Sequence, residues 1–243
     1  MRLYIKHSVN QGITLPISYQ QILQGILYHL MESEDKVSTF LHDRGYQYEK
    51  RLYKLFTFSQ IEGKYVIQDK RITFTDTMAF YVTSAEPRVL NLVAENLKQK
   101  GITYGDVHID EVAVYVSDET VEEEEIMIRM LSPVTVYETL EDGKTHFFEP
   151  EDVEFSQAVN DNFQRKYTSF YGVAPDSFVE IEPIRVIKRD GMTVRYKNFI
   201  IRGFKGVYRL SGKRKYLDFL FQTGLGAKNS QGFGMFEIIQ EGY

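Results

Sequence analysis

Apolar residues recur at two spacings along the first half of the chain, and each spacing predicts one type of element. From Tyr19 to Met31, positions 22, 23, 26, 27 and 30 are apolar, as in an amphipathic helix. A second such set after Pro87 predicts a helix that ends before Gly101. We also expect strands over 3–9, 52–61, 78–83 and 107–116, a hairpin over 64–74, and a helical piece through Val37, Phe40 and Leu41 that stops at Gly45. With the hairpin set aside, the order is βαββαβ.

A similar order of elements recurs after the acidic segment 118–125, DETVEEEE, which is the best candidate linker. The pattern predicts strands over 126–138, 178–189, 192–204 and 233–239, and helices over 152–170 and 213–222. Topology repeats here, whereas the sequence does not. We therefore predict an α+β fold of two tandem ferredoxin-like (RRM-like) modules, 1–118 and 124–243. Sheets of this type are a frequent platform for RNA.

Composition narrows the class of protein. The 243 residues are 43% hydrophobic, which excludes an intrinsically disordered chain. No apolar run approaches the ~18 residues of a membrane helix, and Met1–Pro16 has no signal-peptide core, so we expect a cytoplasmic protein without a membrane partner. The absence of cysteine excludes disulfide frameworks, thiol catalysis and thiolate metal sites.

The net charge of −5 hides a strongly basic segment. Residues 185–215 contain eleven lysines and arginines and a single acid, Asp190. Such a local excess of positive charge matters for a polyanion, because salt screens distant charges. An exposed strand face that only meets solvent is the alternative explanation.

The segment 224–234, GLGAKNSQGFG, carries four glycines: Gly224, Gly226, Gly232 and Gly234. Asn229 stands where a dinucleotide fingerprint needs its third glycine, and a P-loop lysine at the required spacing is missing. The glycines permit positive φ angles and close backbone approach, and Lys228, Asn229 and Ser230 add hydrogen-bond donors. A phosphate-binding loop and a tight structural turn both fit this pattern.

Together with Met235 and Phe236, this segment reads GLGAKNSQGFGMF. It closely resembles the signature glycine-rich loop of the RAMP superfamily of CRISPR-associated proteins. More narrowly, it resembles the endoribonucleases of that superfamily that cut CRISPR-repeat RNA. Three other segments agree in the right order: LQGILYHL at 23–30, TFLHDRG and KLFTFS within 39–59, and RMLSPVTV at 129–136.

The resemblance implies an RNase without metal or other cofactor that cuts precursor RNA within each repeat to make guide RNAs. The RNA 2′-hydroxyl would attack the adjacent phosphate, leaving a 2′,3′-cyclic phosphate and a 5′-hydroxyl. Further partners would be other subunits of an interference complex or a second copy of the chain. A non-catalytic guide-RNA-binding subunit of the same superfamily is the main alternative, and a generic RNA-binding module is another.

Three positions match the catalytic pattern of the family: Tyr28, His42 and Lys54. Transphosphorylation needs a base, an acid and positive charge near the phosphorane. An imidazole titrates near neutrality and can serve as either acid or base. The competing interpretations are that Tyr28 belongs to the core, that His42 only caps a helix, and that nearby Lys50 takes the place of Lys54.

Binding is expected to depend mainly on the basic segment and the glycine-rich loop. The predicted RNA-binding residues are Arg185, Lys188, Arg189, Arg195, Lys197, Arg202, Lys205, Lys213, Arg214, Lys215, Lys228, Asn229 and Ser230.

Overall fold

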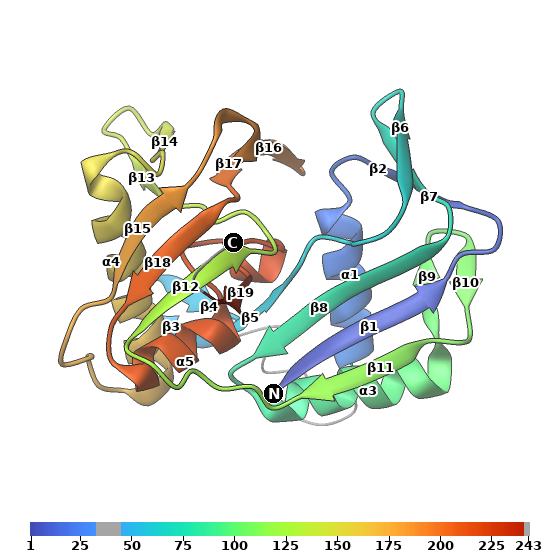
Figure 1. The fold of residues 1–243 in the computed structure, drawn as a ribbon, viewed down its shortest axis with the longest axis horizontal. Coiled ribbons are helices and arrows are strands. Elements are labelled where there is room, and N and C mark those ends of the chain that lie inside the picture. Colours follow the sequence, from blue (N-terminus) through green and yellow to red (C-terminus); the bar gives the residue numbers. More distant parts are fainter. Residues whose placement is uncertain (33–44, 241–243) are drawn as a thin grey trace.

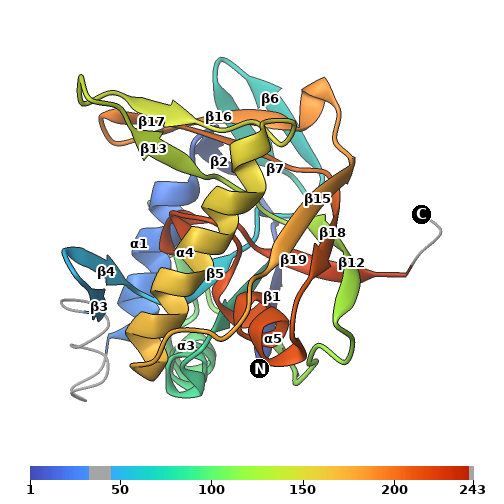
Figure 2. The same cartoon turned by 90° about the vertical axis from the view of Figure 1, so that its left-hand side faces the viewer.

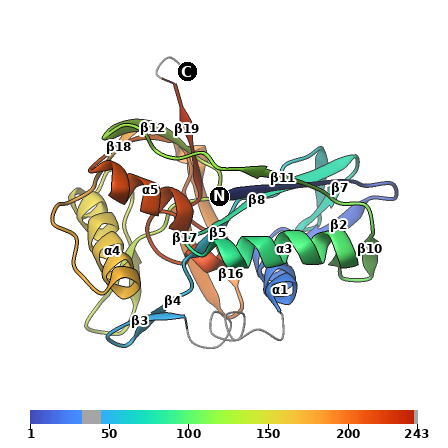
Figure 3. The same cartoon turned by 90° about the horizontal axis from the view of Figure 1, so that it is seen from below.

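The first half of the chain builds a four-stranded sheet with two helices. Its elements are β1 (Arg2–Ser8), α1 (Gln20–Met31), β5 (Phe56–Phe58), β8 (Thr77–Ser84), α3 (Pro87–Lys100) and β11 (Ala113–Ser117). The strands lie in the order β11-β1-β8-β5, and each neighbouring pair is antiparallel. This arrangement is the predicted βαββαβ module. Figure 3 shows both helices on one face of the sheet.

The second half repeats this arrangement. Its elements are β12 (Glu125–Met130), α4 (Val153–Tyr171), β15 (Glu180–Arg185), β18 (Val207–Ser211), α5 (Arg214–Thr223) and β19 (Phe236–Ile239). The strand order is β15-β18-β12-β19, again antiparallel throughout. The two sheets lie side by side in Figure 1. The boundary between domains at 118–124 stays a prediction.

The computed structural model describes residues 1–32 and 45–240, so the helical piece predicted through Val37, Phe40 and Leu41 lies outside the described residues. Short ribbons surround the two sheets. One is a three-stranded sheet of β2 (Ile13–Pro16), β7 (Arg71–Phe74) and β6 (Tyr65–Gln68). The others are two-stranded: β3 (Tyr46–Tyr48) with β4 (Arg51–Tyr53), β9 (Ile102–Tyr104) with β10 (Val107–Ile109), β13 (Tyr137–Thr139) with β14 (Thr145–Phe147), and β16 (Gly191–Tyr196) with β17 (Phe199–Phe204). Two 3-10 turns, η2 (Lys188–Asp190) and η3 (Asn229–Gln231), complete the described elements.

Three predicted strands were wrong in their extent, because the chain changes partner inside each of them. The predicted strand 52–61 divides into β4 and β5 around Leu55, whose φ of 50° interrupts the extended backbone. The predicted strand 107–116 divides into β10, which pairs with β9, and β11, which pairs with β1. Likewise, 126–138 divides into β12 in the main sheet and β13 in a separate ribbon.

The predicted sheet strand 192–204 was also wrong. It is the hairpin β16–β17, which turns at Lys197 with a φ of 52°. Its strands pair with each other over the register 191–204, and a single bridge joins Phe204 to Val134. The missed strand β18 takes its place in the main sheet.

In the helix α1, the residues that the apolar spacing predicted to face the core are buried or partly buried. Leu23, Leu27 and Leu30 of α1 are buried, and they join the core of the first sheet together with Phe56 and Phe80. Burying each such side chain contributes about 1.5–3 kcal/mol. The second core is centred on α4, α5 and the strands that they cover.

Buried contacts join the two halves. The Arg2 guanidinium donates to the Phe236 carbonyl oxygen at 2.8 Å, and it lies 3.9 Å from the centroid of the Phe221 ring. The Thr57 hydroxyl donates to the Phe233 carbonyl at 2.9 Å. The first sheet therefore directly contacts the segment that was predicted to be functional, the glycine-rich loop.

Candidate active site

The glycine-rich loop, 224–234, leaves the end of α5 and folds back on itself. The Leu225 N–H donates to the Gly234 carbonyl oxygen at 2.8 Å and closes the loop. A Cβ at Gly234, where φ is 80°, would lie 2.0 Å from the Leu225 oxygen, and one at Gly232 would lie 2.5 Å from the Phe58 ring. Both positions therefore need glycine, which lets the loop close and pack against β5.

A buried lysine and an asparagine hold the loop from inside. Lys166 of α4 donates from Nζ to the Gly224 carbonyl oxygen and, at 3.0 Å, to Asn229 Oδ1. Asn229 Nδ2 donates to the Leu225 and Phe233 carbonyl oxygens at 2.8 and 3.0 Å. Both amide hydrogens of Asn229 are thus used in hydrogen bonds within the loop. Its contact with RNA stays a prediction.

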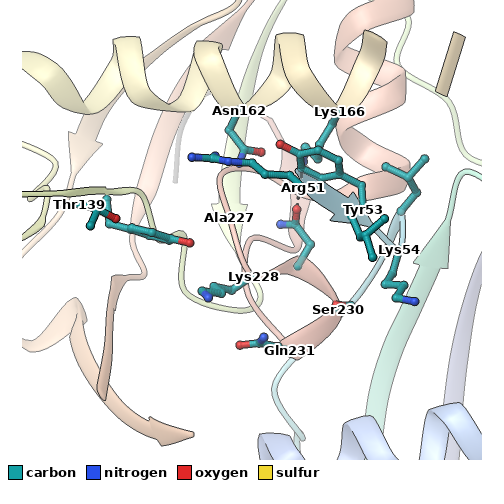
Figure 4. A pocket seen from close by; sticks show the side chains of 14 residues that line it. Arg51, Tyr53, Lys54, Thr139, Asn162, Lys166, Ala227, Lys228, Ser230 and Gln231 are labelled. Carbon is teal, nitrogen blue, oxygen red and sulfur yellow. Dashed lines mark hydrogen bonds between the residues drawn. The ribbon is translucent and has the colours of Figure 1, made fainter. Parts of the chain in front are cut away.

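A cleft of about 340 Å³ opens between this loop, α4 and the segment that follows β3 (Figure 4). Its lining residues are Arg51, Leu52, Tyr53, Lys54, Leu55, Tyr137, Thr139, Asn162, Lys166, Ala227, Lys228, Asn229, Ser230 and Gln231. Four of these residues are lysine or arginine and none is acidic. A cleft of this charge favours an anion.

Three residues that line this cleft carry a buried polar atom. The Tyr53 hydroxyl, Asn162 Oδ1 and Gln231 Oε1 are buried without a hydrogen-bond partner among the described residues. Lys228 lies 5.4 Å from the centroid of the Tyr137 ring. Such unsatisfied polar atoms are costly in a folded protein unless they serve a ligand or water.

Lys54, one of the three predicted catalytic residues, lies in this cleft. Figure 4 shows it at the end opposite Thr139, beyond Ser230. Its side chain is half-buried, and its Cδ lies beside Gly45, where the described chain resumes. Arg51 also lines the cleft, whereas the alternative candidate Lys50 does not. The geometry thus brings Lys54 and Arg51 together with the loop.

Tyr28 reaches the same loop from α1. Its half-buried ring packs edge-on against Phe56, with centroids 5.7 Å apart, and its hydroxyl shares a hydrogen bond with the Ser230 side chain. Burial raises the pKa of Tyr28, although the Ser230 hydrogen bond opposes this shift. The phenol is therefore protonated at neutral pH, a state that can donate a proton.

Gln24 of α1 connects the glycine-rich loop with the hairpin β16–β17. Gln24 Nε2 donates to the Ser230 carbonyl oxygen at 2.6 Å, and the Tyr196 hydroxyl donates to Gln24 Oε1. Figure 2 shows α1 and α4 on the same side of the molecule, with β3 and β4 near their ends. His42, the third predicted catalytic residue, lies outside the described residues.

The basic segment 185–215 does not form one surface. Lys213 and Lys215 both face Asp176, at 2.9 and 4.0 Å, and Arg209 pairs with Glu182 at 2.8 Å. Lys205 precedes β18 and Lys213 follows it, so the two lysines lie toward opposite ends of this strand. Contiguity in sequence therefore did not predict contiguity in space.

The remaining predicted binding residues of the basic segment lie in or beside a second groove, on the hairpin β16–β17 and at the start of α5. Arg185, Arg189 and Lys205 line a second groove, of about 530 Å³, together with Arg129 and three acids: Glu62, Asp190 and Glu237. Lys188 is exposed in η2 beside this groove, and Arg214 is exposed at the start of α5. Arg195 and Lys197 are exposed on β16–β17, and Arg202 pairs with Glu149 at 2.7 Å.

Lys166 and Asn162 are members of the cleft that the sequence analysis missed. Both lie on the buried face of α4, where Phe155, Val159 and Phe163 continue the apolar stripe. The helical period predicts an apolar residue at position 166. A lysine there is unusual, and this signal in the sequence would have identified Lys166.

Neither a metal cluster nor a membrane helix is found among the described elements. His, Asp and Glu side chains in the two described ranges form no group of three or more that could hold a metal ion. None of the described helices is long and apolar enough to cross a membrane.

Comparison with known proteins places the chain among CRISPR-associated proteins. Residues 115–238 match the family model of the CRISPR-associated protein Cas6, C-terminal. The CRISPR-associated endoribonuclease Cas6 1 of Methanocaldococcus jannaschii is 26% identical over 99% of this chain and 94% of its own length. A solved Cas6-related protein from Pyrococcus furiosus has a TM-score of 0.82 at 23% identity, covering 100% of this chain and 99% of its own. An RAMP protein that binds different RNA substrates has a TM-score of 0.80 at 22% identity, covering 99% of this chain and 100% of its own.

Proposed function

Because the chain belongs to the Cas6 family of CRISPR-associated proteins, we propose that it is an endoribonuclease that cuts CRISPR-repeat precursor RNA within each repeat, without a metal ion. The observation that carries this proposal is the cleft, whose described lining offers Arg51, Lys54 and Lys228 and contains no carboxylate. An RNA phosphate suits its charge, and a divalent cation does not. A relative that aligns over nearly the whole chain is named an endoribonuclease, which supports the same function.

The proposed chemistry needs no nucleophile from the protein. The RNA 2′-hydroxyl attacks the neighbouring phosphorus, its proton passes to a base, and the departing 5′-oxygen takes a proton from an acid. Tyr28, with a pKa raised by burial, suits the donor role, and His42 would complete the pair. Lys54, with Arg51 or Lys228, would stabilise the charge that develops on the phosphorane.

A cleavage assay with the protein's own repeat RNA tests this function. Each repeat should be cut once in excess EDTA, and the upstream product should carry a 2′,3′-cyclic phosphate, detectable by mass spectrometry. A strict requirement for magnesium would contradict the proposal. Tight binding without any cut would favour the alternative, a non-catalytic guide-RNA-binding subunit.

The cleft cations should contribute more to RNA affinity than the end of the basic segment. Reversing Arg51 and Lys228 to glutamate should weaken repeat RNA binding and reduce the slope of log affinity against log salt by about 1–2, because fewer counterions are released. The measurement is a filter-binding titration at several salt concentrations.

Lys213→Glu with Lys215→Glu is the matched control, since it changes the formal charge by the same amount. Both lysines already face Asp176, so we expect a smaller loss of affinity and a smaller change in slope. Equal effects from the two double variants would contradict a specific role for the cleft.

A further inference from the structure

Lys166 is a buried cation that has no acidic partner in the described part of the chain. Its side chain is 2% exposed, and no carboxylate among the described residues lies within 4.0 Å of its amine. Burial lowers the pKa of Lys166 to about 7. Taking an ammonium out of water without a counter-ion is costly, and a methionine would fill the same space without that cost. The amine is therefore expected to serve a purpose other than packing.

The amine connects the start of the glycine-rich loop with its middle. It donates to the Gly224 carbonyl oxygen at the start of the loop and to Asn229 Oδ1 near its middle. Asn229 in turn donates to Leu225 and Phe233, one on each side of the η3 turn. Without the amine, Asn229 Oδ1 would lose the hydrogen bond that it accepts from Lys166, and the Gly224 carbonyl oxygen would lose its hydrogen bond from α4.

The next residue of the loop, Ser230, contacts the proposed catalytic tyrosine. Its side chain shares a hydrogen bond with the Tyr28 hydroxyl, and its carbonyl oxygen accepts a hydrogen bond from Gln24 one turn earlier on α1. A continuous series of contacts thus runs from Lys166 on α4 through Asn229 and Ser230 to Tyr28 on α1. This series of contacts joins the core of the second sheet to the core of the first sheet at the edge of the cleft.

We propose that Lys166 is a positioning residue, whose buried amine holds the glycine-rich loop so that Ser230 orients the Tyr28 hydroxyl toward the scissile phosphate. This inference rests on the proposed nuclease function and on the role of Tyr28 in it. Lys166 itself does not touch the RNA, because its amine is enclosed by the loop. Small displacements of a reacting group are enough to slow catalysis, by up to about 10²-fold for ~1 Å.

A double-mutant cycle between Lys166→Met and Tyr28→Phe tests the proposal. Single-turnover cleavage at saturating protein is measured for both single variants, the double variant and the wild type, and the Kd for uncut repeat RNA is measured separately. We expect Lys166→Met to slow cleavage by about 10- to 100-fold with little change in Kd. The double variant should be no slower than Tyr28→Phe alone, since the two residues act through the same hydroxyl.

Several outcomes would overturn the proposal. These are wild-type cleavage by Lys166→Met, a weaker Kd with an unchanged cleavage rate, or losses that multiply in the double variant. If Tyr28→Phe alone cuts at the wild-type rate, the role of Tyr28 fails and the positioning role fails with it. A wild-type protein that binds but never cuts would contradict the proposed function itself, so the two failures are distinguishable.

Two further variants separate positioning from folding. Lys144→Met makes the same substitution at an exposed lysine whose amine pairs with Asp142 at 2.6 Å, and it should cut like the wild type. If Lys166→Met does not fold, Asn229→Ala breaks the same contact from the other side. It should give the same slow cleavage and the same lack of additivity with Tyr28→Phe; multiplying losses there would also overturn the proposal.

Discussion

Replacing His42 with alanine is expected to slow single-turnover cleavage of repeat RNA by about 10²- to 10⁴-fold, the usual contribution of a positioned acid or base. The affinity for uncut RNA should change little, because phosphate binding depends mainly on lysine and arginine. The expectation derives from the FLHDR motif and from the need for a second proton-transfer group beside Tyr28. Cleavage rates at saturating protein, with a separate binding titration, measure both effects.

His29→Ala is the matched control for this experiment. His29 is exposed near the end of α1, where it pairs with Glu32 at 3.1 Å, and it does not line the cleft. It should therefore cleave at the wild-type rate. Near-wild-type cleavage by His42→Ala, or an equal loss in both variants, would remove His42 from the proposed mechanism.

A single 2′-deoxy sugar immediately upstream of the scissile phosphate is expected to abolish cleavage. Only this hydroxyl is close enough to the phosphorus for in-line attack, and the sequence contains no cysteine that could supply a nucleophile instead. Positioning an internal nucleophile makes the reaction effectively unimolecular, and a substrate without this hydroxyl has no such nucleophile. The modified repeat should still bind, because its phosphates are unchanged.

The control is a repeat with the same deoxy substitution one nucleotide further upstream, which should be cut normally. Both substrates are assayed in EDTA, and the cut position is determined on a sequencing gel. Cleavage of the first substrate would refute attack by the RNA hydroxyl and would favour a water nucleophile.

Local patterns in the sequence predicted α1, α3, α4 and α5 well. The apolar spacing of α1 and the stretch from Pro87 to Gly101 in α3 depend on residues within a few turns of each other, so the chain alone contains the necessary information. The glycine-rich loop was recognisable for the same reason. Its four glycines report a backbone with positive φ angles, and each of them has such an angle.

Strand boundaries were less predictable, because a strand ends where its partner ends. The predicted strand 192–204 has the composition of a sheet strand, yet β16 and β17 pair with each other and leave the main sheet to β18. The hydrophobic pattern of a segment indicates that it is extended and half-buried. It does not indicate which other segment pairs with it.

The sequence by itself determined the α+β class, the βαββαβ order of the first half and the glycine-rich loop, because these features depend on local spacing and on residue types. Only the tertiary structure decided which charges share a surface. It separated Lys205 from Lys213 across β18, brought Arg51, Lys54 and Lys228 together from distant segments, and buried Lys166 against the loop. Charge acts through space over about 10 Å, and the chain reaches such distances only through its folded path.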